Sequence, residues 1–412
     1  MCDVAQAYRD HWGRLLALLV RQFRDFEIAE DALAEAFAAA SARWPGGGVP
    51  DNPPAWLLTA ARRRAVDRLR RRDVAERHAP RLIVDEASAD DETDDRLRLV
   101  FTCCHPVLAP EARVALTLRC VAGLSTAQIA ALFLVGESTM AARLTRAKKK
   151  IVAAGVPYRV PQPEDLPERL DSVLSVVYLV FTEGYQARQG TQLLDVDVAA
   201  EAIRLAGQLS DLMPREAEIT ALSALLLLQH SRRDARVDAA GDVILLPDQD
   251  RSLWRRDEIK RAARMLRGLF RRGVPDSRYF LEAQIAAEHC VAADPADVDW
   301  PRIAALYERL EQLTGSPAVR LNWAVAAAEA DGPQAGMDLL EGLDERLPRH
   351  HMLHAARADL LTRLGRAVEA VAAYDRAIQL ANTDAERRFL NAKRDAARAG
   401  VPLQSDDPSG RA

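Results

Sequence analysis

The sequence is poor in cysteine and in aromatic residues, and it has no long apolar run. The cysteines are few, odd in number and without CxxC spacing: Cys2, Cys103, Cys104, Cys120 and Cys290. This pattern argues against a disulfide framework and against a zinc site, so we expect buried thiols. The residues before Trp12 do not form a secretory signal, and no apolar run reaches the roughly 18 residues that span a bilayer. We therefore expect a cytoplasmic protein.

Aromatic residues make up only 5% of the chain, whereas alanine, leucine and arginine are abundant. This composition favours an all-α protein. Since the chain has 412 residues, of which 49% are apolar, it is long enough for sizeable cores in roughly two to four domains. No nucleophile–base pair, phosphate-binding glycine loop or metal-ligand cluster stands out. We therefore predict neither an enzyme nor a cofactor.

The net charge of −4 conceals an asymmetry along the chain. Residues 1–72 carry 12 arginines against 9 acidic residues, and residues 111–160 carry 8 basic residues against 2 acidic ones. Between these blocks, residues 73–95 carry 9 acidic residues against 2 arginines. Two basic blocks with an acidic spacer are typical of a bipartite DNA-binding protein. We predict that 73–95 is a flexible linker, which either only connects the blocks or also covers a basic face.

Residues 123–151 have the pattern of two short helices joined by a tight turn, with Ser125 placed to cap the first. In the second helix, helical spacing predicts a buried stripe of Met140, Leu144, Ala147 and Ile151. A polar and basic face recurs at similar spacing and comprises Thr139, Arg143, Arg146, Lys149 and Lys150. This is the layout of a helix-turn-helix, whose second helix enters the DNA major groove. The alternative is an ordinary helical hairpin with solvated cations.

Three further helices are predicted before the acidic spacer, at about 4–22, 26–44 and 53–72. The polar side of the second includes Glu27, Glu30, Asp31 and Glu35. The run Pro45 to Gly48 is predicted to stop that helix. Asn52 is predicted to cap the third, which carries many arginines around its buried side.

These segments resemble an extracytoplasmic-function sigma factor. FRDFEIAEDALAEAFAAASARWP followed by PPAWLLTAARRRAVDRLRRR looks like domain two of that family, and GLSTAQIAALFLVGESTMAARLTRAKKKI looks like domain four. FTCCHPVLAPEARVALTLRCVAGLST and YLVFTEGYQA resemble a subgroup with a long C-terminal helical extension. The resemblance implies a dissociable subunit that binds core RNA polymerase and directs promoter-specific transcription initiation. Its partners would be core polymerase and the minus-35 and minus-10 promoter elements.

The resemblance also implies roles for individual residues. Docking on core polymerase is implied for Asp31, Glu35 and Phe37. Contact with the minus-10 element is implied for Trp56, Arg62, Arg63 and Asp67, in agreement with base stacking and backbone binding. Reading of the minus-35 element is implied for Thr139, Arg143 and Arg146, while Lys148, Lys149 and Lys150 are expected to hold phosphate. The alternatives are a core position for Trp56 and a solvated face for the arginines.

The expected organisation is domain two at 1–72, the linker at 73–95, domain four at 96–155, a helical extension at 156–400 and a disordered tail at 401–412. Residues 360–381 resemble the second half of a tetratricopeptide repeat, and 303–343 hold a degenerate copy. Stacked helical pairs form a concave surface, so we expect the extension to bind a protein partner and to regulate or support activity. The alternative is that its helices only pack on the sigma domains.

The least helical part of the extension is 241–259, which the resemblance marks as a hallmark of the subgroup. We predict a short strand at 243–246 and then a regulatory turn, capped and with an Asp–Arg pair, comprising Asp248, Asp250, Arg251 and Trp254. This turn lacks the glycine and glutamate of an EF-hand loop, so no metal is predicted there. Three histidines lie close to one another further along the extension: His350, His351 and His354. No acidic or cysteine residue near them in the sequence completes a metal site, so we expect them to be surface and packing residues.

A second hypothesis is a one-component helix-turn-helix regulator with a helical sensing domain. It does not explain why an acidic helix and a basic helix follow each other in 26–72. A third is a tetratricopeptide-like adaptor or enzyme, for which no catalytic constellation is found. In vitro transcription with core polymerase separates the three.

Overall fold

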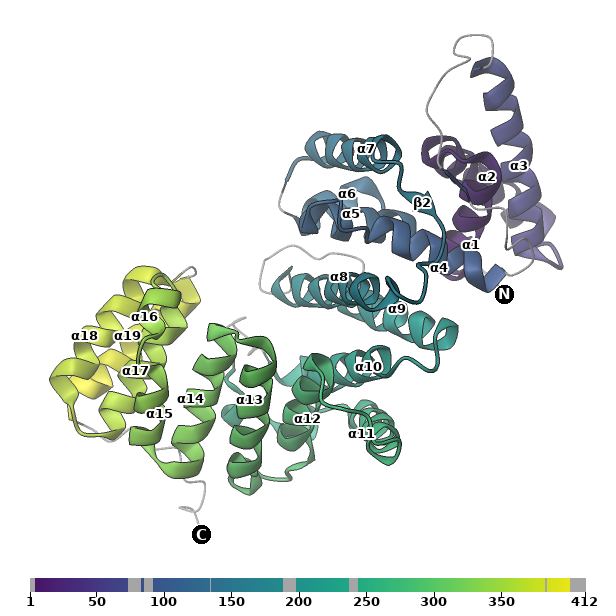
Figure 1. The fold of residues 1–412 in the computed structure, drawn as a ribbon. Coiled ribbons are helices and arrows are strands. Elements are labelled where there is room, and N and C mark those ends of the chain that lie inside the picture. Colours follow the sequence, from purple (N-terminus) through teal and green to yellow (C-terminus); the bar gives the residue numbers. More distant parts are fainter. Residues whose placement is uncertain are drawn as a thin grey trace. The chain divides into compact units, whose positions relative to one another are not determined.

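The computed structural model describes residues 4–72, 83–84, 92–133, 135–187, 198–236, 244–381 and 384–400 and is almost entirely helical (Figure 1). The all-α prediction is confirmed, apart from one pair of two-residue strands. The chain forms two compact units, residues 1–219 (unit 1) and 220–412 (unit 2). The predicted tail and most of the predicted linker lie outside the described residues.

Unit 1 contains the three predicted N-terminal helices and the predicted helix-turn-helix. Its elements are α1 Val4–Phe23, α2 Phe26–Gly47, α3 Pro53–Arg72, β1 Ile83–Val84, α4 Glu92–Cys103, α5 Pro110–Cys120, α6 Thr126–Leu132, α7 Glu137–Ala153, β2 Pro157–Tyr158, α8 Leu166–Ala187 and α9 Val198–Leu212. Helix α4 begins inside the stretch predicted to be linker. The reason is Asp95, which is buried in ion pairs with Arg21 and Arg98 instead of being solvated.

Local signals in the sequence set the ends of several helices. Asp25 caps α2, Asn52 caps α3 and Ser125 caps α6, each by accepting backbone N–H groups of the first turn. Helix α2 continues through Pro45 to Gly47, and the residue that follows it is Gly48, whose φ of 81° favours glycine. The run Pro45 to Gly48 does end the helix, as predicted, although Pro45 itself is still helical, because in the last turn its missing N–H removes a single hydrogen bond.

The two strands connect distant parts of unit 1. β1 pairs with β2 in parallel, so that Ile83 lies opposite Pro157 and Val84 opposite Tyr158. Tyr158 is fully buried, and its hydroxyl donates to the carbonyl of Ala17 in α1 at 3.1 Å. The segment after α7 is thereby joined both to α1 and to the connection between α3 and α4.

The beginning of the extension packs into unit 1. Helix α9 lies along α8, and α8 covers α4, α5 and α6. Arg169 of α8 donates to the carbonyl of Phe101 at 2.6 Å, and the Ser172 hydroxyl donates to the carbonyl of Cys104 at 2.9 Å. The apolar side chains that α8 buries include Val173, Leu174, Val177 and Phe181. Unit 1 therefore continues well past residue 156, where the extension was expected to begin.

Unit 2 is a succession of packed helices. They are α11 Arg256–Arg271, α12 Arg278–Val291, α13 Trp300–Thr314, α14 Pro317–Asp331, α15 Pro333–Leu340, α16 Leu343–Arg346, α17 His351–Arg363, α18 Ala367–Leu380 and α19 Asp384–Arg398, after α10 Ala217–His230, which begins just before the boundary. Helices α17 and α18 form a hairpin with Gly365 at φ 76° between them. Ala370, Tyr374 and Ala377 are buried in this hairpin, which is the helical pair that a tetratricopeptide-like unit requires.

Two expectations for the stretch after α10 were wrong. Ile244 and Leu245 form no strand, and Leu246 begins a 3₁₀ turn that includes Asp248; Val243 lies outside the described residues. Nor does Asp250 pair with its neighbouring arginine. Its carboxylate caps the next 3₁₀ turn by accepting the N–H of Ser252 at 2.8 Å.

Arg251 instead closes the C-terminal end of α12. Its guanidinium donates to the carbonyls of His289 and Ala292, each at 2.8 Å, and lies 4.5 Å from the ring centre of the buried Trp254. Carbonyls at a helix C-terminus have no partner within the helix, so a buried cation there satisfies them. This explains why Arg251 turns away from Asp250, whose carboxylate is already satisfied by backbone N–H.

Candidate nucleic-acid interface

Helix α7 has one buried and one accessible side. Met140, Leu144, Ala147 and Ile151 are buried, as predicted. The accessible side carries Thr139, Arg146, Lys149 and Lys150, all exposed. Arg143 is half-buried, and its guanidinium lies 5.5 Å from the ring centre of Phe133 in the turn of the helix-turn-helix. The predicted minus-35 residues therefore lie on one helix, with Arg143 resting on the turn.

Helix α3 has a basic outer side. Arg62, Arg63 and Asp67 are exposed, and the Nε of Arg62 donates to the Gln22 side chain at 2.9 Å. Trp56 is half-buried, because its ring meets that of Trp44 edge-to-face with centres 5.8 Å apart. The predicted minus-10 residues thus share one helix and remain reachable. Leu57, Ala61 and Ala65 hold its inner side in the core.

Two acidic residues of α2, Asp31 and Glu35, face basic residues of α3. Asp31 accepts from Arg68 at 2.6 Å, and Glu35 accepts from Arg64 at 2.7 Å and from Arg68 at 2.6 Å. Hydrogen bonds from Arg68 and Arg64 lower the pKa of Glu35. All four side chains are more than a third exposed, so each pair contributes little to stability and is easily exchanged for another partner.

Phe37, predicted to dock on polymerase, is a core residue in this structure. It is 5% exposed, and its ring centre lies 4.8 Å from that of Tyr8 and 6.0 Å from that of Trp12. A large aromatic on the inner side of an amphipathic helix is more stable in the core than in water. Phe37 therefore supports α2 from inside.

A buried ion cluster that the sequence did not reveal links α2 to the helix-turn-helix. Glu30 is 8% exposed; its carboxylate accepts from Nε of Arg119 at 2.6 Å and from Nζ of Lys148 at 2.5 Å. Burial by itself raises the pKa of Glu30, but the charges of Lys148 and Arg119 lower it below the ordinary 4.5. Lys148 was expected to hold phosphate, and in this structure it holds Glu30. The partners are 89 and 118 positions from Glu30, a distance at which no sequence pattern connects them.

Helix α1 also lies close to the end of α5 and to the segment between α5 and α6. Trp12 of α1 donates its ring N–H to the carbonyl of Arg119 at 3.2 Å, and the Tyr8 hydroxyl donates to the carbonyl of Gly123 at 2.8 Å. A Cβ added to Gly13 would lie 2.6 Å from the carbonyl oxygen of Val121. Only glycine fits at this position, because a backbone atom on the facing segment occupies the space of a side chain.

Replacing Gly13 by alanine is expected to lower the free energy of unfolding of unit 1 by about 1–3 kcal/mol, the cost of forcing a methyl into a packed contact. Gly207 of α9 is the matched control, since an added Cβ meets nothing within 4 Å there. Gly207→Ala should stabilise by about 0.5–1 kcal/mol through helix propensity. Urea denaturation of the full chain measures both, and equal effects would contradict the close contact.

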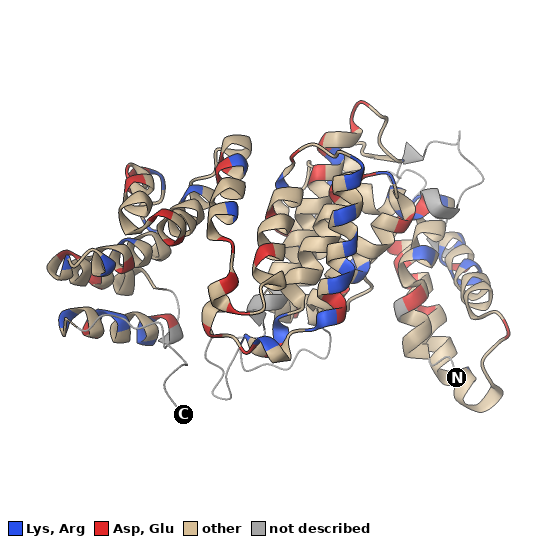
Figure 2. Cartoon of the chain, turned by 90° about the horizontal axis from the view of Figure 1, so that it is seen from below, with Lys and Arg blue, Asp and Glu red and all other residues tan. Residues whose placement is uncertain are grey.

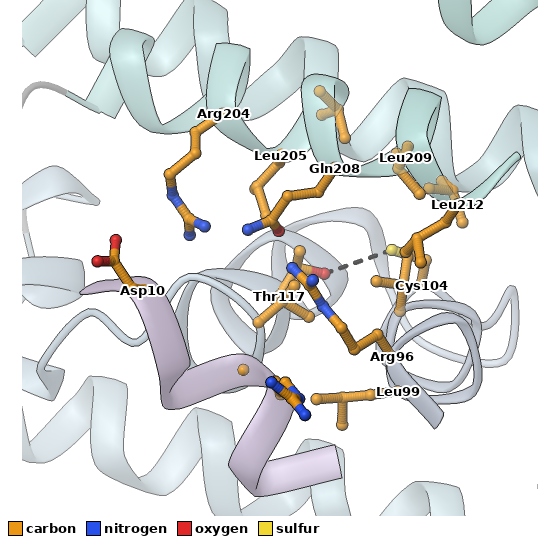
Figure 3. A pocket seen from close by; sticks show the side chains of 16 residues that line it. Asp10, Arg96, Leu99, Cys104, Thr117, Arg204, Leu205, Gln208, Leu209 and Leu212 are labelled. Carbon is orange, nitrogen blue, oxygen red and sulfur yellow. Dashed lines mark hydrogen bonds between the residues drawn. The ribbon is translucent and has the colours of Figure 1, made fainter. Parts of the chain in front are cut away.

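A small hollow lies where α1, α4, α5, α8 and α9 meet (Figure 3). Arg96 and Arg204 extend into it from different helices, and its apolar lining includes Leu99 and Leu205. Burial and the nearby Arg204 and Arg14 lower the pKa of Arg96. The cavity volume is about 20 Å³, room for about one water or small ion, so the hollow is too small for an organic ligand.

Four of the five cysteines lie among the described residues, and all four are free and buried, as predicted: Cys103, Cys104, Cys120 and Cys290. Burial raises the pKa of the Cys104 thiol to about 11. Within the described ranges, no group of three or more His, Cys, Asp or Glu side chains is placed to hold a metal ion. None of the helices described here has the length and apolarity to cross a membrane.

Comparison with protein families matches three segments of the chain. Residues 7–74 match Sigma-70 region 2, residues 98–151 match Sigma-70 region 4, and residues 169–269 match a family of unknown function, DUF6596. The fold and these matches define the class: the chain carries the DNA-binding, helix-turn-helix regions of a sigma-70-type transcription factor. It is also 42% identical to an uncharacterized protein of Rhizobium meliloti (strain 1021), R00370, over 92% of both chains. The chain therefore belongs to the same family as that protein.

A more distant similarity covers about a third of the chain. The chain is 30% identical over 158 residues to the probable ECF RNA polymerase sigma factor SigI of Mycobacterium tuberculosis, in strains CDC 1551 and H37Rv. This similarity covers 36% of the chain and 54% of SigI. No solved structure gives a match.

Proposed function

We propose that this protein is a sigma factor that binds core RNA polymerase and directs promoter-specific initiation of transcription. The observation that carries the proposal is the combination, within one compact unit, of region 2 with the exposed basic side of α3 and region 4 with the accessible polar side of α7. A one-component regulator needs only the second of these. The name of the SigI relative supports the same conclusion.

In this proposal the acidic side of α2 docks on core polymerase through Asp31 and Glu35. Both carboxylates are held by arginines of α3 at 2.6–2.7 Å, but at an exposed position where such pairs are weak. Docking would exchange these arginines for cations of polymerase and would leave Arg64 and Arg68 free to hold DNA. Core binding and capture of the melted minus-10 strand are then coupled through the same ion pairs.

Trp56, Arg62 and Arg63 are proposed to hold the displaced strand. An aromatic ring stacks on an unpaired base, and arginines neutralise its phosphates. Trp56 is only half-buried against Trp44, so one part of its ring is available for stacking. Asp67 lies about one turn beyond Arg63 on the same helix and is exposed.

In α7, we expect Arg143 to recognise a base of the promoter and Lys149 to bind the phosphate backbone without sequence preference. Arg143→Ala should cost about 1–3 kcal/mol at one promoter position, because a guanidinium that leaves the Phe133 ring can bind guanine at two points. Lys149→Ala should weaken all promoter sequences alike and lower the slope of log K against log salt by about 1. Binding measured across single-base promoter variants tests this; uniform losses for both substitutions would refute this division of roles.

The experiment that tests the proposed function is in vitro transcription with core polymerase on a randomised promoter library. A sigma factor is required for initiation and selects a promoter sequence from the library. A one-component regulator only changes initiation by polymerase that already carries another sigma factor. An adaptor changes nothing, so no selected promoter and no dependence on the chain would overturn the proposal.

A further inference from the structure

Helix α11 of unit 2 has a charge pattern that the sigma regions do not account for. Residues 256–272 contain seven basic residues and two acidic ones, in a chain whose net charge is −4. Five of the basic residues follow one line at i, i+4, i+8, i+11 and i+15, and two lie beside it. All seven are exposed and form what we name the α11 stripe: Arg256, Lys260, Arg264, Arg267 and Arg271, flanked by Arg261 and Arg272.

The acidic residues do not neutralise the stripe. Asp257 and Glu258 are both in the first turn of α11, and Glu258 binds Arg233 at 2.9 Å and His230 at 3.1 Å. In the part of the chain that is described, none of the seven cations forms an ion pair with an Asp or Glu side chain. Most surface helices intersperse acids at i+3 or i+4, which stabilises the helix by a few tenths of a kcal/mol for each pair. Here the like charges instead repel one another, a cost that an anionic partner removes.

The opposite side of α11 is already occupied. Ile259, Ala262, Leu266 and Leu269 are at most 6% exposed and pack inside unit 2. A helix that binds a membrane surface needs its apolar side free to enter the lipid. A protein interface needs an apolar or aromatic centre, and Phe270 is the one large apolar side chain of α11 that is exposed. These two observations disfavour a membrane and an acidic protein as the partner.

Shape and residue type fit the backbone of duplex DNA. From residue 256 to residue 271 the stripe is about 22 Å long, and duplex of that length carries about 13 phosphate charges. Six of the seven cations are arginine, whose planar guanidinium binds phosphate oxygens at two points. In Figure 2, which views the chain from below, a column of blue runs along this helix.

We propose that the α11 stripe is a third DNA-binding surface, which holds the phosphate backbone of double-stranded DNA without reading sequence. It lies mainly in the segment that matches the family of unknown function, outside both sigma regions. The extension thereby adds affinity for the DNA on which the sigma regions select a site. This inference does not depend on sigma activity, because backbone binding requires neither a promoter nor polymerase.

The test uses the full chain and a 25-base-pair duplex without promoter elements, with binding followed by fluorescence anisotropy at several salt concentrations. The variant Lys260→Gln/Arg264→Gln/Arg267→Gln should bind about tenfold more weakly, and the slope of log K against log salt should fall by about 2–3. The matched control is Arg349→Gln/Arg376→Gln/Arg388→Gln, which removes three exposed cations of unit 2 outside α11 and should leave both quantities unchanged. Circular dichroism confirms that both variants are folded.

Two further measurements decide the outcome. In a Lys149→Gln/Lys150→Gln background, the stripe variant should lose the same factor again, because the two surfaces act on separate phosphates. Stripe and control variants with equal duplex affinity and equal salt slope would overturn the proposal. So would a stripe variant that keeps its duplex affinity but loses binding to core polymerase or to vesicles of phosphatidylglycerol. Absence of promoter-specific transcription by the wild-type chain would refute the proposed function and leave this result standing.

Discussion

Replacing Glu30 by alanine is expected to lower the free energy of unfolding of unit 1 by about 3–5 kcal/mol, the usual cost of leaving buried charges unpaired. The substitution removes the carboxylate that holds both Arg119 and Lys148, whose side chains are only 15% and 13% exposed. Without the carboxylate, both cations would remain largely buried. Urea denaturation of the full chain, followed through the signal of unit 1, measures the loss.

The matched control is Glu35→Ala, which removes a carboxylate of the same helix from two arginines at an exposed position. It should cost about 0–1 kcal/mol. A further variant, Glu30→Met/Lys148→Met, should recover part of the loss, because one buried charge disappears with its partner. Equal effects of Glu30→Ala and Glu35→Ala would show that the cluster is not buried in solution.

The same cluster gives the stability of unit 1 a dependence on pH. The pKa of Glu30 is lowered in the folded state relative to its ordinary value of 4.5. A carboxyl of this kind contributes stability above the unfolded pKa and loses it as pH falls through the lower, folded value. The difference between wild type and Glu30→Ala should therefore be full at neutral pH and should shrink below about pH 4.5.

Shortening the chain from its C-terminus is expected to lower transcription strongly. The position of the cut determines whether the loss reflects the missing extension or a destabilised region 4. A chain ending at residue 216, between α9 and α10, keeps the helices of unit 1 that cover the sigma regions. It should fold and bind promoter DNA, yet transcribe about tenfold less than the full chain, a loss of ~1.4 kcal/mol. This follows if the extension supports activity by positioning DNA or a partner, as its stacked helices and the α11 stripe suggest.

A cut after Val160 has a different consequence. It removes α8, whose buried Val173, Val177 and Phe181 cover the helices of region 4. Each such side chain contributes about 1.5–3 kcal/mol when buried, so region 4 itself should be destabilised. Comparing the thermal unfolding and the transcription of both truncations separates the two effects. Full or raised transcription by the chain ending at 216 would mean that the extension inhibits instead.

Apolar periodicity and capping residues were sufficient to predict the helices of the sigma regions, because both act within a few residues. The buried stripe of α7 and the caps at Asn52 and Ser125 are examples. The same reasoning failed for polar side chains whose partners are distant in the sequence. Glu30 was assigned to the polar side of its helix, although it is buried against residues from α5 and α7.

The candidate site was predictable to a similar extent. Residues that project from α3 and α7 are accessible where the pattern placed them, since a helix fixes which residues share a side. The pairing of α2 acids with α3 arginines was not predicted, because it depends on how two helices cross. The same holds for Arg251, whose partners are the carbonyls at the end of another helix. The α11 stripe, in contrast, is visible in the sequence as a helical repeat of cations that was not singled out.

The two-residue pairing of β1 with β2 limits how far regions 2 and 4 can separate. Arg72 ends α3 and Ile83 begins β1, so while the strands remain paired the connecting chain spans at most about 36–40 Å. If the strands separate, the connection extends to Glu92 at the start of α4, and its greatest span becomes about 66–72 Å. In the proposed function, once the buried contacts between the two regions have opened, this short pairing would select between two tether lengths, and with them the range of spacings between promoter elements that one molecule can bridge.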